Sequence, residues 1–282
     1  MSCDIDWDAV PPLRDVIARH ELKATKKLGQ NFLLDTNITD KIVTDAGRSV
    51  GDFTDMTVFE IGPGPGGLTR SLLKSKAQQV IAIEFDPRAV RALQELKDIA
   101  PQRLQIIHGD ALEADLAALA PQGRRAIVAN LPYNIATPLL VSWLRHIRNQ
   151  PGFCDMMALM FQREVADRIC AAPGTGAYGR LAVLAQWLCE TKTLYRLPPR
   201  AFTPPPKVHS AVVQFIPRAP AKDAPAFEDL EKVTATAFQQ RRKMARSALK
   251  PYEDRFARAG IDPAARPETL SIAQYLELAR KI

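Results

Sequence analysis

The stretch "VFEIGPGPGGLT", residues 58–69, begins as an apolar β-strand and ends in a turn that contains four glycines. Three of them, Gly62, Gly64 and Gly67, have the G-x-G-x-x-G spacing that follows the first strand of dinucleotide-binding folds. Glycines at this point let the backbone approach a ligand, and the next helix directs its N-terminus toward it. The stretch therefore predicts a ligand site at the end of the first strand of a doubly wound sheet.

The rest of the chain up to about residue 216 alternates apolar, β-branched runs with amphipathic segments of helix length. This pattern predicts βαβ units and a parallel sheet covered on both faces. The predicted strands are Val58–Gly62, Val80–Phe85, Leu104–His108, Ala126–Asn130, Met156–Phe161, Thr193–Leu197 and Val208–Ile216. The predicted helices are Leu13–Leu22, Leu68–Lys76, Pro87–Ile99 and Pro138–Arg148, the last capped by Thr137. We expect the last two strands to pair as an antiparallel edge.

The composition indicates a soluble protein with a nucleic-acid partner. The 282 residues are 46% hydrophobic, which is enough for a full core, and no apolar run has the length of a membrane span. The N-terminus has no signal-peptide pattern, so we expect a cytoplasmic protein. The four cysteines form no C-x-x-C pair, so neither a metal site nor a disulfide framework is predicted. The net charge is +7, and the last 76 residues contain 14 Lys and Arg against 9 Asp and Glu, which favours a polyanion.

Two acidic residues follow predicted strands at the rim where the ligand is expected. Glu84 ends "VIAIE", 22 positions after Gly62, where an acid holds ribose hydroxyls in such folds; a solvated acid at a strand end is the alternative. Asp110, in "HGDAL", could accept from an adenine amine or simply cap the next segment. Because a dinucleotide and S-adenosylmethionine both contain an adenosine ribose, these residues leave both cofactors open.

The fourth predicted strand ends in "ANLPYN", residues 129–134. Asn130, Leu131, Pro132 and Tyr133 place an amide, backbone carbonyls and an aromatic ring at the same rim. This set suits a planar base with an exocyclic amine. The alternative is an ordinary turn in which Tyr133 packs.

The segments "NLPY" and "EIGPGPGGLT" together resemble those of the ribosomal RNA adenine N6-methyltransferases. The similarity extends from Lys26 through most of the chain, in "KKLGQNFLLD", "FQREVADRI", "YGRLAVLAQ", "AFTPPPKVHSAVV" and "QRRKMARSAL". It implies a class I S-adenosylmethionine-dependent methyltransferase of α/β class, with a Rossmann-like seven-stranded sheet and a small C-terminal all-α domain. We expect an N-terminal extension (1–25), the methyltransferase domain (26–216) and a helical RNA-binding domain (217–282).

Within this family the resemblance is to the bacterial small-subunit enzymes. It implies N6,N6-dimethylation of two adjacent adenines in the 3′-terminal hairpin loop of 16S rRNA, with S-adenosylmethionine as cofactor. The implied partner is 16S rRNA in an immature 30S subunit, and the implied state is a monomer without metal or membrane. The alternatives are a large-subunit RNA methyltransferase, a nicotinamide oxidoreductase and a non-catalytic binding protein on the same fold.

The resemblance also assigns roles to single residues. The implied cofactor contacts are Asn31, Leu33, Gly62, Glu84, Asp110 and Asn130. The implied catalytic residues, which hold the base, are Asn130, Leu131, Pro132, Tyr133 and Phe202. The predicted RNA-binding residues are Lys26, Lys27, Arg241, Arg242, Lys243, Arg246 and Lys250. On a helical wheel, "RRKMARSALK" places its cations on one face and Met244, Ala245, Ala248 and Leu249 on the other.

Overall fold

The computed structural model describes residues 5–22, 30–240 and 242–280, and the chain divides into two compact units. Unit 1 comprises Met1–Leu140, Gly152–Arg163 and Thr193–Gln214. Unit 2 comprises Val141–Pro151, Glu164–Lys192 and Phe215–Ile282.

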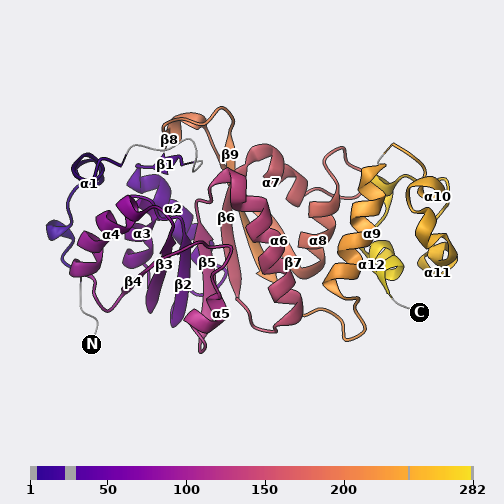
Figure 1. Cartoon of the computed structure of the whole chain (residues 1–282), viewed down its shortest axis with the longest axis horizontal. Helices are drawn as coiled ribbons and strands as arrows, with labels where there is room; N and C mark the ends of the chain where they lie inside the picture. The colour runs from indigo at the N-terminus through magenta and orange to yellow at the C-terminus, as the bar shows by residue number, and fades with distance from the viewer. Residues whose placement is uncertain (1–4, 23–29, 241, 281–282) are drawn as a thin grey trace. The chain divides into compact units, whose positions relative to one another are not determined.

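A seven-stranded sheet with the order β4-β3-β2-β5-β6-β9-β7 forms the framework of the chain (Figure 1). Its strands are β2 (Met56–Ile61), β3 (Gln79–Glu84), β4 (Leu104–His108), β5 (Arg124–Ala129), β6 (Met156–Gln162), β7 (Cys189–Leu197) and β9 (Ser210–Pro217). The neighbours from β4 to β6 are parallel, and each of the seven predicted strands is confirmed. The chain leaves β2 toward β3 and later returns to its other side as β5, so a topological switch point lies between β2 and β5.

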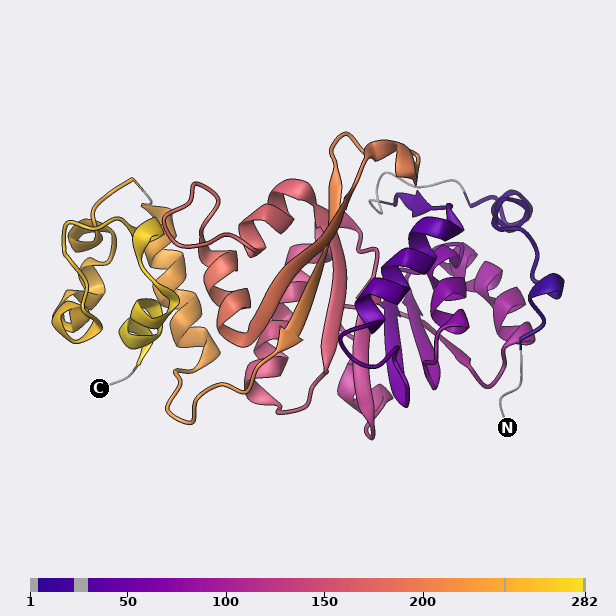
Figure 2. The same ribbon diagram turned by 180° about the vertical axis from the view of Figure 1, so that it is seen from behind.

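Helices between the strands cover the sheet (Figures 1 and 2). They are α2 (Thr36–Gly47), α3 (Gly67–Lys74), α4 (Pro87–Ile99), α5 (Leu116–Leu119), α6 (Tyr133–Asn149) and α7 (Arg163–Ile169). Helix α4 has the predicted bounds because Asp86 accepts the N–H of Arg88 as its N-cap and Pro87 occupies the first position. Strand β2 is buried along its whole length, as expected of a strand covered on both faces.

The predicted start of α6 at Pro138 is wrong. The helix begins at Tyr133, and Pro138 lies inside it. The carbonyl of Pro132 accepts the N–H groups of Ile135 and Ala136, each at 3.1 Å, so the helix is already formed before the proline. An internal proline removes only one backbone donor, and the surrounding structure can tolerate this cost. The "NLPY" segment therefore leads directly into a helix.

A small sheet of β1 (Phe32–Leu33) and β8 (Phe202–Thr203) was not predicted. The two strands are antiparallel, with Leu33 opposite Phe202. Two residues are too few for an alternating pattern to be visible in the sequence. The pairing brings residues 30–33, called the N-terminal arm, against the proline-rich segment of residues 198–206.

The N-terminal helix α1 (Leu13–Arg19) ends three residues earlier than predicted. Val16 and Leu22 pack against Ala89 and Ala92 of α4. Glu95 of α4 also binds this segment, because its carboxylate lies 2.6 Å from His20 Nε2 and 2.9 Å from Arg19 Nη1. Residues 13–22 are thus fastened to the α/β core.

Unit 2 contains a helical core around α9 (Phe227–Gln239), which packs against α8 (Arg180–Leu188) and α12 (Ile272–Ala279). The Trp187 ring stacks on Phe227 with centroids 6.3 Å apart. Two short helices, α10 (Ala245–Ala248) and α11 (Phe256–Ala259), complete the C-terminal part. Residues 218–226, between β9 and α9, contain neither helix nor strand.

Candidate cofactor and base site

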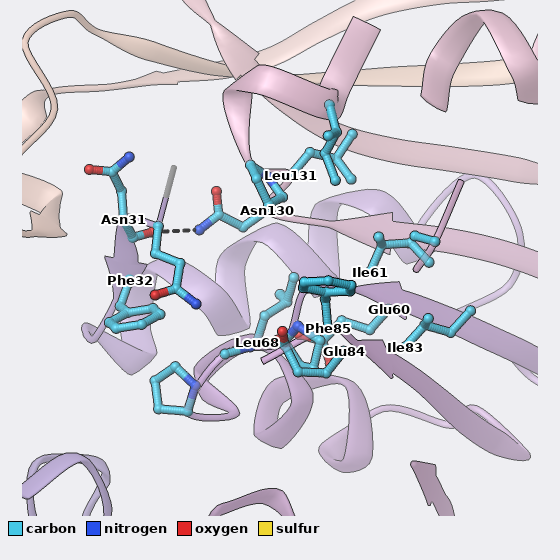
Figure 3. Close-up of a pocket in the computed structure, with 18 of the residues that line it drawn as sticks. Asn31, Phe32, Glu60, Ile61, Leu68, Ile83, Glu84, Phe85, Asn130 and Leu131 are labelled. Atoms are coloured by element: carbon cyan, nitrogen blue, oxygen red, sulfur yellow. Dashed lines mark hydrogen bonds between the residues drawn. The ribbon is translucent and has the colours of Figure 1, made fainter. Parts of the chain in front are cut away.

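A cavity of about 240 Å³ opens in unit 1 at the carboxyl ends of β2, β3 and β5. Its walls come from the N-terminal arm, the glycine loop, the ends of β3 and β4, and the "NLPY" segment. Figure 3 shows Asn31 and Asn130 facing each other on one side, with Glu60, Glu84 and Phe85 grouped nearby. The cavity lies at the switch point, where ligands bind in open α/β sheets.

The glycine loop fits closely against its neighbours at two positions. Gly64 has a φ of +56°, and a Cβ there would lie 2.8 Å from the Phe32 ring. A Cβ on Gly67 would lie 2.5 Å from the carbonyl oxygen of Leu33. Both positions therefore require glycine, because a side chain would push the N-terminal arm away from the cavity.

Glu84 is buried, with 5% of its surface exposed. Its Oε2 accepts the Gly64 N–H at 2.9 Å and its Oε1 accepts the Asp86 N–H at 2.8 Å. Burial raises the pKa of this carboxyl, and the hydrogen bonds from Asp86 and Gly64 oppose that rise. The alternative of a solvated acid is wrong. A ribose-binding role for Glu84 stays a prediction.

Asp110 lines the cavity at the end of β4. Its Oδ1 accepts the N–H of Leu112 at 2.9 Å, so the carboxylate stabilises the turn that follows. The capping function expected as an alternative is therefore present. Because Asp110 also lines the cavity, its contact with an adenine amine stays a prediction.

The Asn130 amide has a fixed orientation. Its Nδ2 donates to the backbone carbonyl of Asn31 at 2.9 Å (Figure 3), which identifies Oδ1 as the end that remains as an acceptor. No described residue donates a hydrogen bond to this oxygen. Leu131 and Pro132 continue the cavity wall. The arrangement presents an oriented acceptor at the rim of the sheet.

The two aromatic residues predicted to hold a base differ in their surroundings. Tyr133 lines the cavity, and its Oη lies 2.6 Å from the Ser210 Oγ. Burial raises the pKa of Tyr133, and this hydrogen bond opposes the rise. Phe202 is 3% exposed and is not among the residues that line the cavity. The structure thus brings residues 130–133 together at the cavity, whereas Phe202 is buried and does not line it.

Glu60 and Phe85 also line the cavity, and neither was predicted from the sequence to be a site residue. Phe85 is 59% exposed although it is a large apolar side chain, so its ring is available to a planar group. Its position directly after Glu84 was the signal for this role. Glu60 lies within the buried strand β2, and its Oε2 makes no hydrogen bond within the described part of the chain. A buried carboxylate oxygen without a hydrogen-bond partner, in a residue that lines a cavity, indicates a ligand-facing group.

Burial raises the pKa of Glu60 to about 8, and Thr69 only partly opposes this rise. A glutamate in the unfolded chain titrates near pH 4.5. The folded state therefore keeps its proton over a range in which the unfolded state loses it. The contribution of this bound proton to the free energy of unfolding is fully present below about pH 4.5 and is lost as the pH rises to about 8.

We therefore expect Glu60→Gln to stabilise the protein at high pH. In urea unfolding without cofactor, the variant should gain roughly 3–5 kcal/mol over wild type on going from about pH 5 to about pH 9. Glu113→Gln changes an exposed glutamate of the same unit and serves as the control. If the free energies of unfolding of Glu60→Gln and wild type differ by the same amount at every pH, the raised pKa of Glu60 is contradicted.

The predicted RNA-binding residues are only partly described. Lys26, Lys27 and Arg241 lie outside the described residues. The helix predicted across "RRKMARSALK" is wrong, because α10 has only four residues and Arg242 and Lys243 precede it. Met244, expected to pack, is 42% exposed because it precedes the helix in extended backbone. The described cations of the set, Arg242, Lys243, Arg246 and Lys250, are exposed.

Within residues 5–22, 30–240 and 242–280, no group of three or more His, Cys, Asp or Glu side chains is placed to hold a metal ion. No helix of these residues combines the length and the apolar character that crossing a membrane requires.

The sheet order, the glycine loop and the buried acid at the end of β3 define a class I methyltransferase fold. Two solved structures resemble it. The 23S rRNA methyltransferase ErmE has a TM-score of 0.66 and 28% identity, with 88% of this chain and 98% of that chain covered. A dimethyladenosine transferase from Plasmodium falciparum has a TM-score of 0.68 and 24% identity, with 86% and 94% covered; this likeness supports the fold alone.

The sequence comparisons identify the family. The family model for ribosomal RNA adenine dimethylase matches residues 21–282. The chain is 53% identical to ribosomal RNA small subunit methyltransferase A of Rhodospirillum rubrum, over 100% of this chain and 96% of that protein. It is also 53% identical to the protein of that name from Rhizobium johnstonii, over 98% of each. The chain belongs to the ribosomal RNA adenine dimethylase family.

Proposed function

We propose that this protein uses S-adenosylmethionine to convert two adjacent adenines of small-subunit ribosomal RNA to N6,N6-dimethyladenine. The target is the 3′-terminal hairpin loop of 16S rRNA in an immature 30S subunit, and the protein acts as a cytoplasmic monomer. Family membership and relatives named as small-subunit methyltransferases support the proposal. The observation that carries it is the oriented Asn130 amide at the rim of the cavity.

The cavity fits the proposed cofactor in three respects. Its glycine loop provides a close backbone surface, and the Glu84 carboxylate lies beside it to bind ribose hydroxyls. The exposed Phe85 ring offers a face to adenine. The unpaired Glu60 oxygen provides a buried hydrogen-bonding group for a polar part of the ligand. Asn31, Leu33, Gly62 and Asp110 complete the proposed cofactor contacts.

The residues of the "NLPY" segment position the substrate amine. Adenine N6 is a weak nucleophile because its lone pair is delocalised into the ring. S-adenosylmethionine supplies an electrophilic methyl group when it is bound. The Asn130 Oδ1 and the Leu131 carbonyl accept hydrogen bonds from the amine and turn its lone pair toward that methyl group. The amine becomes acidic as it gains the methyl group, so its proton leaves to water.

Aromatic stacking holds the base. The Ser210 hydroxyl fixes the Tyr133 ring through Oη, and a base stacked on such a ring gains roughly 1–3 kcal/mol. Pro132 forms the adjoining wall. Phe202 covers the other face of the base. Because its ring is buried in the structure, the paired strands β1 and β8 move to expose it. A base in a hairpin loop leaves its stack at lower cost than a base in a duplex.

The proposal is tested by adding labelled S-adenosylmethionine to the purified protein with immature small subunits or with large-subunit RNA. We expect the label to enter small-subunit RNA only, within a fragment that contains the 3′-terminal hairpin. Label in large-subunit RNA alone would contradict the proposed substrate. Label in neither RNA would contradict the activity.

A further inference from the structure

A proline-rich segment in unit 1 forms an exposed surface with only positive charge. Residues 191–222 contain six Lys and Arg and no Asp or Glu. Residues 199–209, here called the basic loop, run from just before β8 to just before β9. Within the loop, Arg200, Lys207 and His209 are exposed. Apart from Phe202, no residue of the basic loop has a role in the site described above.

No carboxylate of the described residues neutralises the charges of Arg200 and Lys207. Among the described residues, neither forms an ion pair with a carboxylate. Cations at the opposite, amino-terminal edge of the same sheet do form such pairs: Arg48 with Asp45 at 3.0 Å, Lys76 with Asp52 at 3.5 Å and Arg124 with Asp155 at 3.2 Å. The basic loop therefore differs from an ordinary solvated surface of mixed charge, and its potential favours an anionic partner.

Two contacts fasten the basic loop to the cavity wall. Near its start, Phe202 pairs with Leu33, and Figure 1 shows β8 beside β1. Directly after its end, the Ser210 hydroxyl contacts Tyr133. Leu33 and Tyr133 both line the cavity. Lys207 precedes Ser210 by three residues, so the Cα atoms of the two lie within roughly 11 Å of each other.

The composition of the basic loop suits a phosphate backbone. Pro204, Pro205 and Pro206 restrict the backbone, so less conformational entropy is lost when a ligand binds. Guanidinium and ammonium groups bind phosphate through charge-assisted hydrogen bonds. Val208 is the large apolar side chain exposed here, at 43%, and a single one gives little surface for a protein partner.

We propose that Arg200 and Lys207 bind backbone phosphates of the RNA strand next to the adenine that enters the cavity. This inference rests on the proposed function, because it assumes that a single-stranded RNA segment reaches the Tyr133 side of the cavity. The basic loop then contributes affinity and holds the strand in position, while the residues in the cavity select the base.

The test measures how the affinity for a hairpin RNA depends on salt. We compare wild type with the double variant Arg200→Gln/Lys207→Gln. Each phosphate contact to a single strand contributes about −0.7 to the slope of log affinity against log salt, so the slope should become shallower by roughly 1.4. Between 50 and 200 mM salt, wild type should therefore lose roughly sevenfold more affinity than the variant does.

Three controls separate a local effect from a general loss of charge. Arg48→Gln/Lys76→Gln removes two exposed cations at the other edge of the sheet and should leave the slope unchanged. Arg200→Lys/Lys207→Arg keeps the charges and should keep the slope. S-adenosylmethionine affinity should be the same in all variants, because these residues do not line the cavity.

A wild-type protein that methylates the hairpin, together with an unchanged slope in Arg200→Gln/Lys207→Gln, would overturn the role of the basic loop alone. An equally shallow slope of log affinity against log salt in the control Arg48→Gln/Lys76→Gln would also overturn the role of the basic loop. A wild-type protein that methylates neither the hairpin nor immature small subunits would overturn the proposed function and, with it, this inference.

Discussion

Asn130→Ala should lower the rate of methyl transfer by about 10²- to 10³-fold, a size typical of losing one positioned polar group at a reacting atom. The reason is geometric. The Asn130 amide is held by its hydrogen bond to the Asn31 carbonyl, so the wild-type acceptor is already oriented before the substrate arrives. The measurement is single-turnover methylation of the hairpin RNA with saturating cofactor, together with the RNA dissociation constant.

RNA affinity should change by less than about threefold in Asn130→Ala, because phosphate contacts supply most of the binding energy. Asn130→Asp should also lose activity, since a carboxylate oxygen would replace Nδ2 and repel the Asn31 carbonyl. Asn149→Ala, at the exposed far end of α6, is the matched control. Equal losses of methyl transfer and RNA binding in Asn130→Ala would contradict the assigned role.

Glu84→Ala should weaken S-adenosylmethionine binding by about 10²-fold, because hydrogen bonds to a charged group contribute about 1.5–3 kcal/mol. The Glu84 carboxylate also accepts the Gly64 and Asp86 N–H groups and so orients the glycine loop. The substitution removes this acceptor. Isothermal titration calorimetry measures the cofactor affinity, and the affinity for RNA should persist.

The isosteric variant Glu84→Gln separates shape from charge. The Gly64 and Asp86 N–H groups contact different oxygens of Glu84, and in glutamine an NH2 group that cannot accept replaces one of these oxygens. We expect its cofactor affinity to lie between those of wild type and Glu84→Ala. Glu113→Ala, an exposed acid outside the cavity, should bind normally. Unchanged affinity in both Glu84 variants would remove Glu84 from the cofactor site.

The fold could be predicted because its signals are local. Strands β2, β3, β5 and β6 contain short apolar runs. The turns that follow β2 to β5 contain a glycine, acid or amide that the sequence displays directly. Asp86 and Pro87 similarly marked the start of α4. The signal was misleading at α6, since Pro138 is usually found at a helix start but here lies five residues inside the helix.

The parts that could not be predicted depend on contacts between distant segments. Leu33 meets Phe202 across 169 positions of the sequence, and no local pattern marks this pairing. Glu60 occupies a position within an apolar strand, so its sequence neighbours did not reveal that it faces a cavity. Asn130 could be identified as a site residue, but its amide orientation depends on the Asn31 carbonyl.

The proposed function is tested most directly by nucleoside mass spectrometry of the hairpin RNA after reaction with S-adenosylmethionine labelled in its methyl group. We expect two adjacent adenosines in the loop, each with two labelled methyl groups on N6, formed by wild type and almost absent with Asn130→Ala. Labelled methyl groups on a ring nitrogen, a carbon or the ribose would contradict the proposed function.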